Sequence, residues 1–136
     1  MIDNRTAPYA ALVLRVTLGV MFIAHSLILK YFVFTLPGTA QFFQSLGLPA
    51  ALAYLTFWAE LIGGVLLVAG VATRWVALAL IPILAGAAWV HLGNGWVFSA
   101  ANGGWEYPVF LIAASLVQAL LGDGKYAFTL KKEIYA

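Results

Sequence analysis

Cysteine is absent from this chain of 136 residues, and charged residues make up only 9% of it. Without cysteine the chain forms no disulfide and offers no thiolate for catalysis or for a zinc or iron–sulfur site. The formal net charge is only +2, and no basic run of the kind that binds nucleic acid is present. These shortages exclude disulfide-stapled proteins, thiol enzymes and nucleic-acid-binding proteins.

Apolar residues are plentiful instead. Hydrophobic residues account for 64% of the chain, and the mean hydropathy is +0.98. A soluble protein needs a polar exterior, which this composition cannot supply. The lipid bilayer is therefore the expected surrounding, and the length fits a single domain covering residues 1–136.

Four segments are long and apolar enough to cross a membrane, which takes about 20 mostly apolar residues. Stretches rich in glycine, proline and asparagine separate them. The predicted fold is an all-α membrane protein, a bundle of four transmembrane helices at residues 9–34, 49–71, 75–93 and 106–121.

The basic residues predict an orientation. With four crossings, one side of the membrane receives most of them, and the other side has only Lys30. Because basic loops stay in the cytoplasm, both termini are expected there, in a multi-pass protein of the cell inner membrane. The segment 39–49 would lie along the outer surface. The basic residues on the cytoplasmic side are Arg5, Arg74, Lys125, Lys131 and Lys132.

Glu60 is the only charged residue between Tyr31 and Thr73. A helix rises by about 1.5 Å per residue, which puts Glu60 roughly 16 Å from the cytoplasmic end of its helix, near the bilayer centre. Small residues one turn away allow another helix to approach closely, so Glu60 should point into the bundle. Arg15 lies at a depth from which it could reach Glu60, and such a partner would keep the carboxylate ionised.

A Glu60–Arg15 pair has two interpretations. It could be a structural contact that fixes helix register, or a proton-handling carboxylate beside a redox or ligand pocket. His25 and His91 both come out roughly 24 Å deep, in the outer half of the membrane, which favours the second interpretation. Glu106 begins the last helix on that side, where the helix dipole favours an anion. Glu60, His25 and His91 are therefore the predicted catalytic residues.

The paired histidines have other uses. Two histidines can hold a haem, but nothing else in the chain resembles a haem site, so haem is not favoured. A metal site of two histidines and a carboxylate is weak because the spacing is not local, and no metal site is predicted. Proton transfer and hydrogen bonding to a quinone carbonyl are commoner roles. The residues predicted to bind a quinone or other substrate are Arg15, Lys30, Glu106 and Tyr107.

Taken together, five motifs resemble those of the DoxX family, and the resemblance runs from about residue 15 to residue 124. One departure stands out: many members have glycine after the first-helix histidine, whereas this chain has Ser26, whose hydroxyl could bond back to a helix carbonyl and bend the helix. The motifs are R-x3-G-x2-F-x2-H-x4-K (15–30), SLGLP (45–49), AELIGG followed by GVATR (59–74), GGWEYP (103–108) and GDG (122–124).

The resemblance implies a small four-helix membrane protein. The family takes its name from a subunit associated with a quinone-reducing thiosulfate oxidoreductase, and its members are widely labelled oxidoreductases. The expected function is therefore that of an integral component of a quinone-linked redox system, with a quinone as cofactor and a soluble or membrane redox partner, or a second copy of the chain, beside it. The alternatives are a non-enzymatic anchor or docking subunit for a redox partner and a small-molecule transporter.

Overall fold

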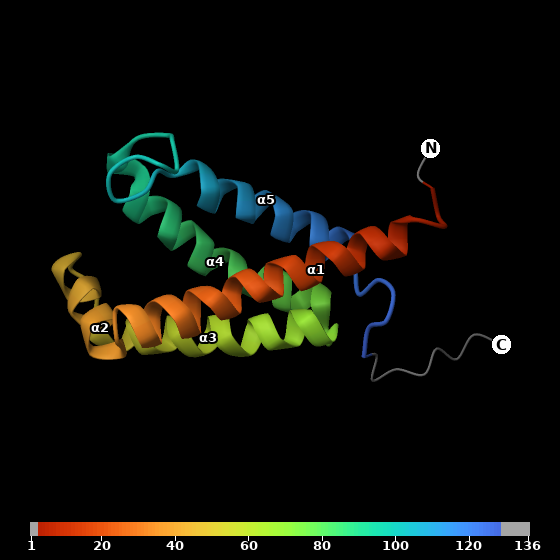
Figure 1. Cartoon of the computed structure of the whole chain (residues 1–136), viewed down its shortest axis with the longest axis horizontal. Coiled ribbons are helices and arrows are strands. Elements are labelled where there is room, and N and C mark those ends of the chain that lie inside the picture. Colours follow the sequence, from red (N-terminus) through yellow and green to blue (C-terminus); the bar gives the residue numbers. More distant parts are fainter. Residues whose placement is uncertain (1–2, 129–136) are drawn as a thin grey trace.

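The computed structural model describes residues 3–128, so Lys131 and Lys132 lie outside the described part. Every regular element within residues 3–128 is a helix, and none is a strand. Figure 1 shows the chain as long helices joined by short connections. In chain order these elements are α1 (Ala7–Ile23), η1 (Ala24–Val33), α2 (Leu36–Ser45), α3 (Ala50–Ala69), α4 (Thr73–His91), η2 (Leu92–Asn94) and α5 (Glu106–Leu121).

Three helical stretches are long and apolar enough to cross a membrane: Ala7–Val33, Ala50–Ala69 and Thr73–Asn94. The helix α5 is also apolar but has only 16 residues. The predicted class, an all-helical multi-pass membrane protein, is therefore confirmed. The fourth crossing and the direction of the termini stay predictions.

The long helices associate in two pairs. The first helix, made of α1 and η1, packs along α3, and α4 packs along α5. In Figure 1, α2 and the loop between α4 and α5 lie at one end, while the first described residues and the segment after α5 lie at the other. The sequence motifs around residues 70–74 and 122–124 thus meet at the end where α1 begins.

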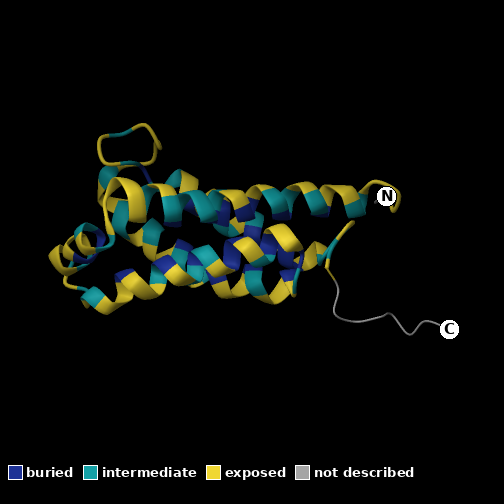
Figure 2. Ribbon diagram, turned by 60° about the horizontal axis from the view of Figure 1, so that its bottom comes forward, coloured by how far each residue is buried: buried dark blue, intermediate teal, exposed yellow. Residues whose placement is uncertain are grey.

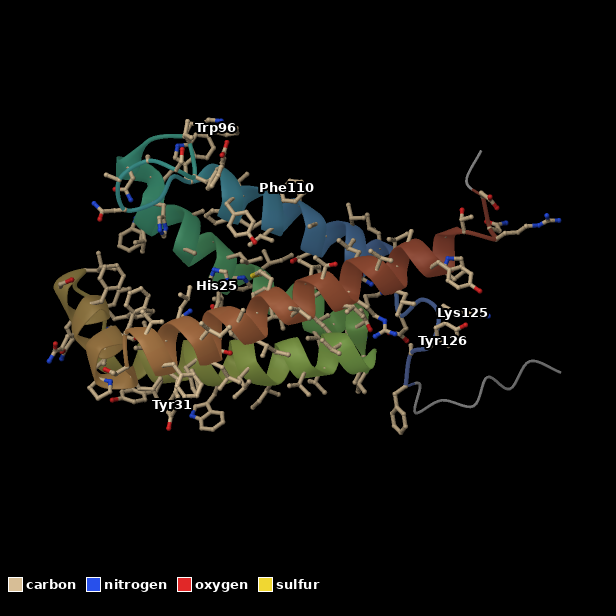
Figure 3. All side chains as sticks on the ribbon, in the orientation of Figure 1. His25, Tyr31, Trp96, Phe110, Lys125 and Tyr126 are labelled. Carbon is tan, nitrogen blue, oxygen red and sulfur yellow. The ribbon has the colours of Figure 1, made fainter. Side chains whose placement is uncertain are left out.

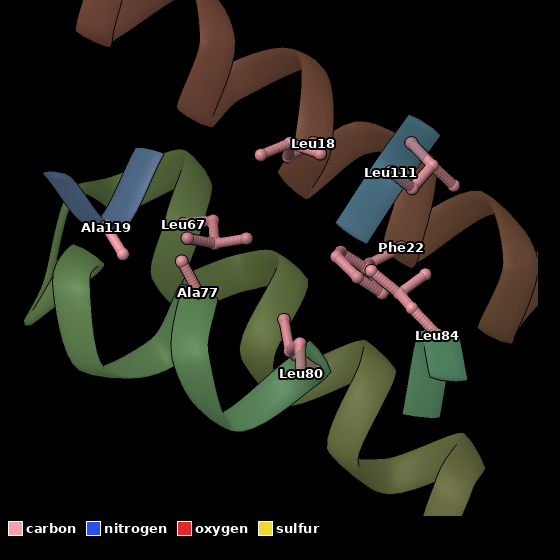
Figure 4. Packing of buried hydrophobic residues seen from close by; sticks show 8 residues of the cluster. All are labelled: Leu18, Phe22, Leu67, Ala77, Leu80, Leu84, Leu111 and Ala119. Atoms are coloured by element: carbon pink, nitrogen blue, oxygen red, sulfur yellow. The ribbon is translucent and has the colours of Figure 1, made fainter. Parts of the chain in front are cut away.

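A small apolar core joins the two pairs (Figure 4). Burying such side chains among helices from both pairs fixes how the pairs sit against each other. Large apolar side chains on the outside stay exposed, which suits contact with lipid (Figure 2). The core consists of Leu18, Phe22, Leu67, Ala77, Leu80, Leu84, Leu111 and Ala119.

The first helix changes its winding at Ala24, where a π-helix of 10 residues begins. Ser26 is fully buried, and its hydroxyl donates a 3.0 Å hydrogen bond to the Ile23 carbonyl, as the sequence led us to expect. At the far end, the Phe34 amide donates to the Leu29 carbonyl, five residues earlier. A π-helix is more loosely wound than an α-helix and is frequent at functional sites. This segment carries both His25 and Lys30.

Candidate functional site

Glu60 is only 5% exposed and lies on the buried face of α3. The small residues Ala53, Gly63 and Gly64 share that face. The predicted inward direction of the Glu60 side chain is therefore confirmed. A buried carboxylate needs a partner, because leaving it alone in a low-dielectric interior is costly.

The partner of Glu60 is Lys30. The Lys30 ammonium donates a 2.7 Å hydrogen bond to Glu60 Oε2, and the two side chains are 15% and 7% exposed. The sequence placed Lys30 at the outer interface, but its side chain instead reaches back from η1 toward the middle of α3. This contact is a largely buried ion pair between the first helix and α3.

The predicted Glu60–Arg15 pair is wrong. Arg15 is 1% exposed, and its guanidinium donates hydrogen bonds to backbone carbonyl groups. On α3 it reaches the carbonyls of Leu67, at 3.0 Å, and Val68. After α5 it reaches the carbonyls of Asp123, at 2.9 Å, and Lys125, at 3.0 Å.

The carbonyl groups at the end of α3 are available as acceptors because the last carbonyls of a helix have no partners within the helix. Arg15 supplies donors to the end of α3 and to the segment after α5. Asp123 adds a second link there, since its Oδ1 accepts the Thr73 amide at the start of α4 at 3.0 Å. Arg15 therefore ties three separate parts of the chain together, and we find it in a structural role.

The depth estimate failed because it measured each helix from its own end. Gly19 lies directly against Gly64 and Val68, so the start of α1 extends past the level at which α3 ends. Arg15, one turn before Gly19, therefore meets the last turn of α3 and lies about two turns from Glu60.

His25 lies on η1, five residues before Lys30, and Figure 3 places it on the side of the first helix that faces α4. Its Nδ1 contacts the Met21 carbonyl at 3.0 Å. The structure therefore brings together Glu60, which was predicted to be catalytic, and Lys30, which was predicted to bind substrate, and it places His25 on the same π-helix as Lys30.

His91 is placed elsewhere, at the end of α4. Its Nδ1 lies 2.7 Å from the Ala87 carbonyl, and its ring packs against Gly103 in the loop before α5. Nothing described in the structure joins His91 to His25. Within residues 3–128, no group of three His, Cys, Asp or Glu side chains could hold a metal ion.

Glu106 and Tyr107 line a separate hollow of about 430 Å³ at the same end as His91. Glu106 Oε1 accepts the Phe98 amide at 3.0 Å, and the Trp96 and Trp105 rings meet edge to face with centroids 4.4 Å apart. Figure 3 shows Trp96 in the loop beside α5. Glu106 holds the loop against α5, and with Tyr107 it forms a site distinct from the ion pair.

Sequence reasoning missed three polar side chains near the Arg15 end. Thr73, Ser115 and Gln118 are completely buried. Gln118 donates a 2.8 Å hydrogen bond to the Gly122 carbonyl, which stabilises the turn that follows α5. The spacing of Ser115 and Gln118, three residues apart on the helical face of Leu111, could have indicated that both point inward.

Comparison with known proteins gives two matches. The model of a protein family described as DoxX matches residues 10–93. A protein of Bacillus subtilis (strain 168) named "Putative oxidoreductase CatD" is 43% identical over 121 residues, which cover 88% of this chain and 84% of that protein. No solved structure matches the chain.

Proposed function

Because the chain belongs to the DoxX family of membrane proteins, we propose that it is the membrane component of a quinone-linked redox system. The observation that carries the proposal is the Lys30–Glu60 ion pair, with His25 on the same π-helix as Lys30. Ionisable groups deep in a membrane protein usually mark a substrate or proton pathway. The related Bacillus protein is named as an oxidoreductase, which also supports a redox function.

The polar atoms fit the carbonyl oxygens of a quinone. A lysine ammonium has three N–H donors, and Lys30 uses one of them on Glu60. The His25 ring contacts Met21 through Nδ1, and its Nε2 has no hydrogen-bond partner within residues 3–128. Tyr31, which follows Lys30 in the chain, is half exposed and stacks on the buried ring of Phe57 with centroids 6.2 Å apart, so it offers aromatic surface to a flat ring.

Each residue has a distinct part in this proposal. A bound quinone accepts two electrons and two protons and becomes a quinol. Lys30 would hold and polarise one carbonyl by hydrogen bonding, while His25 and Glu60, after each takes up a proton from the aqueous phase, would deliver the two protons. A redox partner protein would supply the electrons, since the chain has no cysteine for an iron–sulfur cluster of its own.

The charges support a topology. Arg5, Arg74 and Lys125 all belong to the end where the described chain begins and finishes, whereas the connections 34–49 and 92–105 at the other end contain no Lys or Arg. Lys30 is neutralised by its ion pair with Glu60 and adds no free charge there. We propose that α5 is a fourth crossing and that both termini face the cytoplasm of an inner membrane.

The test is quinone binding by the purified protein, with a quinone analogue titrated into detergent-solubilised samples. Lys30→Met and His25→Ala should each weaken binding about tenfold, the cost of one hydrogen bond to a charged or buried group. His91→Ala is the matched control, because His91 makes the same kind of backbone contact at a distance from the ion pair. Equal affinities for wild type, His25→Ala and Lys30→Met would falsify the proposal.

A docking subunit without quinone chemistry is the second candidate. The observation favouring it is that Lys30 and Glu60 already satisfy each other, as a purely structural ion pair would. Replacing both with methionine separates the candidates. A folded double variant that no longer binds quinone supports the redox role, whereas one that supports full partner activity supports docking.

A further inference from the structure

We propose that the groove between α4 and α5 beside Arg74 binds an anionic phospholipid. The groove encloses about 340 Å³ and is lined by Arg74 and by four apolar residues, Leu78, Leu116, Ala119 and Leu120. It lies far along α5 from Glu106 and shares no residue with the Lys30–Glu60 pair. The site is therefore additional to the proposed quinone function.

Arg74 is the cation that lines the groove and can meet a headgroup. At the same end of the molecule, Arg15 is occupied by carbonyl groups, and the Lys125 ammonium lies over the rings of Tyr9 and Tyr126, 5.9 Å from each centroid. Arg74 is exposed and forms no ion pair or side-chain hydrogen bond within residues 3–128. A guanidinium of this kind matches a phosphate, because its planar N–H groups can grip two oxygens at once.

The apolar part of the groove matches an acyl chain. Leu78, Leu116 and Leu120 are 38%, 45% and 81% exposed, so they form an open apolar furrow that runs along both helices from Arg74 toward the membrane centre. An occupant must then carry a negative charge at the cytoplasmic surface and hydrocarbon below it. Phospholipids with a net negative headgroup meet both demands, and basic sites between helices on that side are known to hold them.

The guanidinium lies against Gly122. A Cβ atom at Gly122 would make an ordinary contact with Arg74 Nη2, at 3.6 Å, so Arg74 is folded over the end of α5 rather than extended into water. Next to it, Trp75 is 70% exposed, which suits an aromatic ring at the headgroup level of a membrane. The charge thus sits at the height where a lipid phosphate is found.

The experiment is native mass spectrometry of the purified full chain with added palmitoyl-oleoyl phosphatidylglycerol or phosphatidylcholine. The wild-type protein should retain phosphatidylglycerol preferentially. Arg74→Gln should lower that preference about fivefold, the worth of one basic residue at an anionic membrane surface, and Arg74→Lys should keep most of it. Arg5→Gln is the matched control, since Arg5 is an exposed cation at the same end that does not line the groove.

A second variant tests the groove while leaving the charge in place. Leu116→Trp fills the furrow and should reduce retention of phosphatidylglycerol even though Arg74 is present, so the test still applies if Arg74→Gln does not fold. Unchanged lipid preference in Arg74→Gln, or unchanged retention in Leu116→Trp, would overturn the proposal. An equal loss in Arg5→Gln would also overturn it, by showing a general effect of surface charge.

Discussion

Gly19 on α1 and Gly64 on α3 press their backbones against each other. A Cβ atom at Gly19 would come within 2.6 Å of the Gly64 carbonyl oxygen, and one at Gly64 would come within 2.8 Å of the Gly19 carbonyl oxygen. Such small-residue contacts are how membrane helices approach closely. The contact lies between Arg15 and the Lys30–Glu60 pair, so it sets the register on which both depend.

Larger side chains at this contact should force the first helix away from α3. We expect Gly19→Val and Gly64→Val to destabilise the protein by about 1–3 kcal/mol, the usual cost of overpacking. Gly86→Ala is the control, because a Cβ at Gly86 on α4 meets nothing within 4 Å. The check is thermal unfolding in detergent, and a Gly86→Ala protein as unstable as Gly64→Val would contradict the contact.

Breaking the ion pair from one side should cost more than removing both partners. Glu60→Met or Lys30→Met leaves a buried charge alone, with an expected loss of about 3–5 kcal/mol, whereas the double methionine variant should be close to wild type in stability. Unfolding in a denaturing detergent measures the stability of the wild type, the two single variants and the double variant. Simple addition of the two single losses in the double variant would mean that the residues do not interact.

Arg15→Lys should loosen the end of the molecule even though it keeps the charge. Lysine cannot reproduce the planar fork of arginine, so bonds to the carbonyls of α3 or of residues 123 and 125 are lost, at about 1.5–3 kcal/mol for each charge-assisted bond. Hydrogen exchange should rise in residues 122–128 and in the last turn of α3. Arg5→Lys, on the exposed side of the same end, should leave exchange unchanged.

The topology can be read by thiol labelling, since the chain has no cysteine to remove. In intact cells, a membrane-impermeant maleimide should modify Ser99→Cys, in the loop before α5, and should spare Asn4→Cys and Lys125→Cys until the cells are opened. All three positions are exposed in the structure. Labelling of Lys125→Cys in intact cells would show that α5 does not cross.

The helices could be predicted from the sequence because each one is an apolar run bounded by residues that end helices. The expected segment 106–121 coincides with α5, and Gly70, with φ of 76°, ends α3 in the left-handed conformation that glycine favours. The inward direction of Glu60 also followed from its small neighbours. These properties depend on residues that are close together in the sequence, so they can be recognised without knowing how the helices pack.

The partners of the buried charges could not be predicted in the same way. Which residue meets Glu60 depends on how far α1 slides along α3, and the Gly19–Gly64 contact sets that distance. It also depends on the π-helix at Ala24–Val33, which turns Lys30 to a position that an ordinary helix would not give it. Neither the sliding distance nor the winding leaves a regular pattern in the sequence.

Arg15 has a further consequence for the order of assembly. Its acceptors on Asp123 and Lys125 lie 108 and 110 residues later in the chain. A membrane protein is made and inserted from its N-terminus, so the first helix enters the bilayer before any of the four acceptors of its guanidinium, and two of these follow only after α5. The first helix to be inserted is therefore among the last to complete its hydrogen bonds.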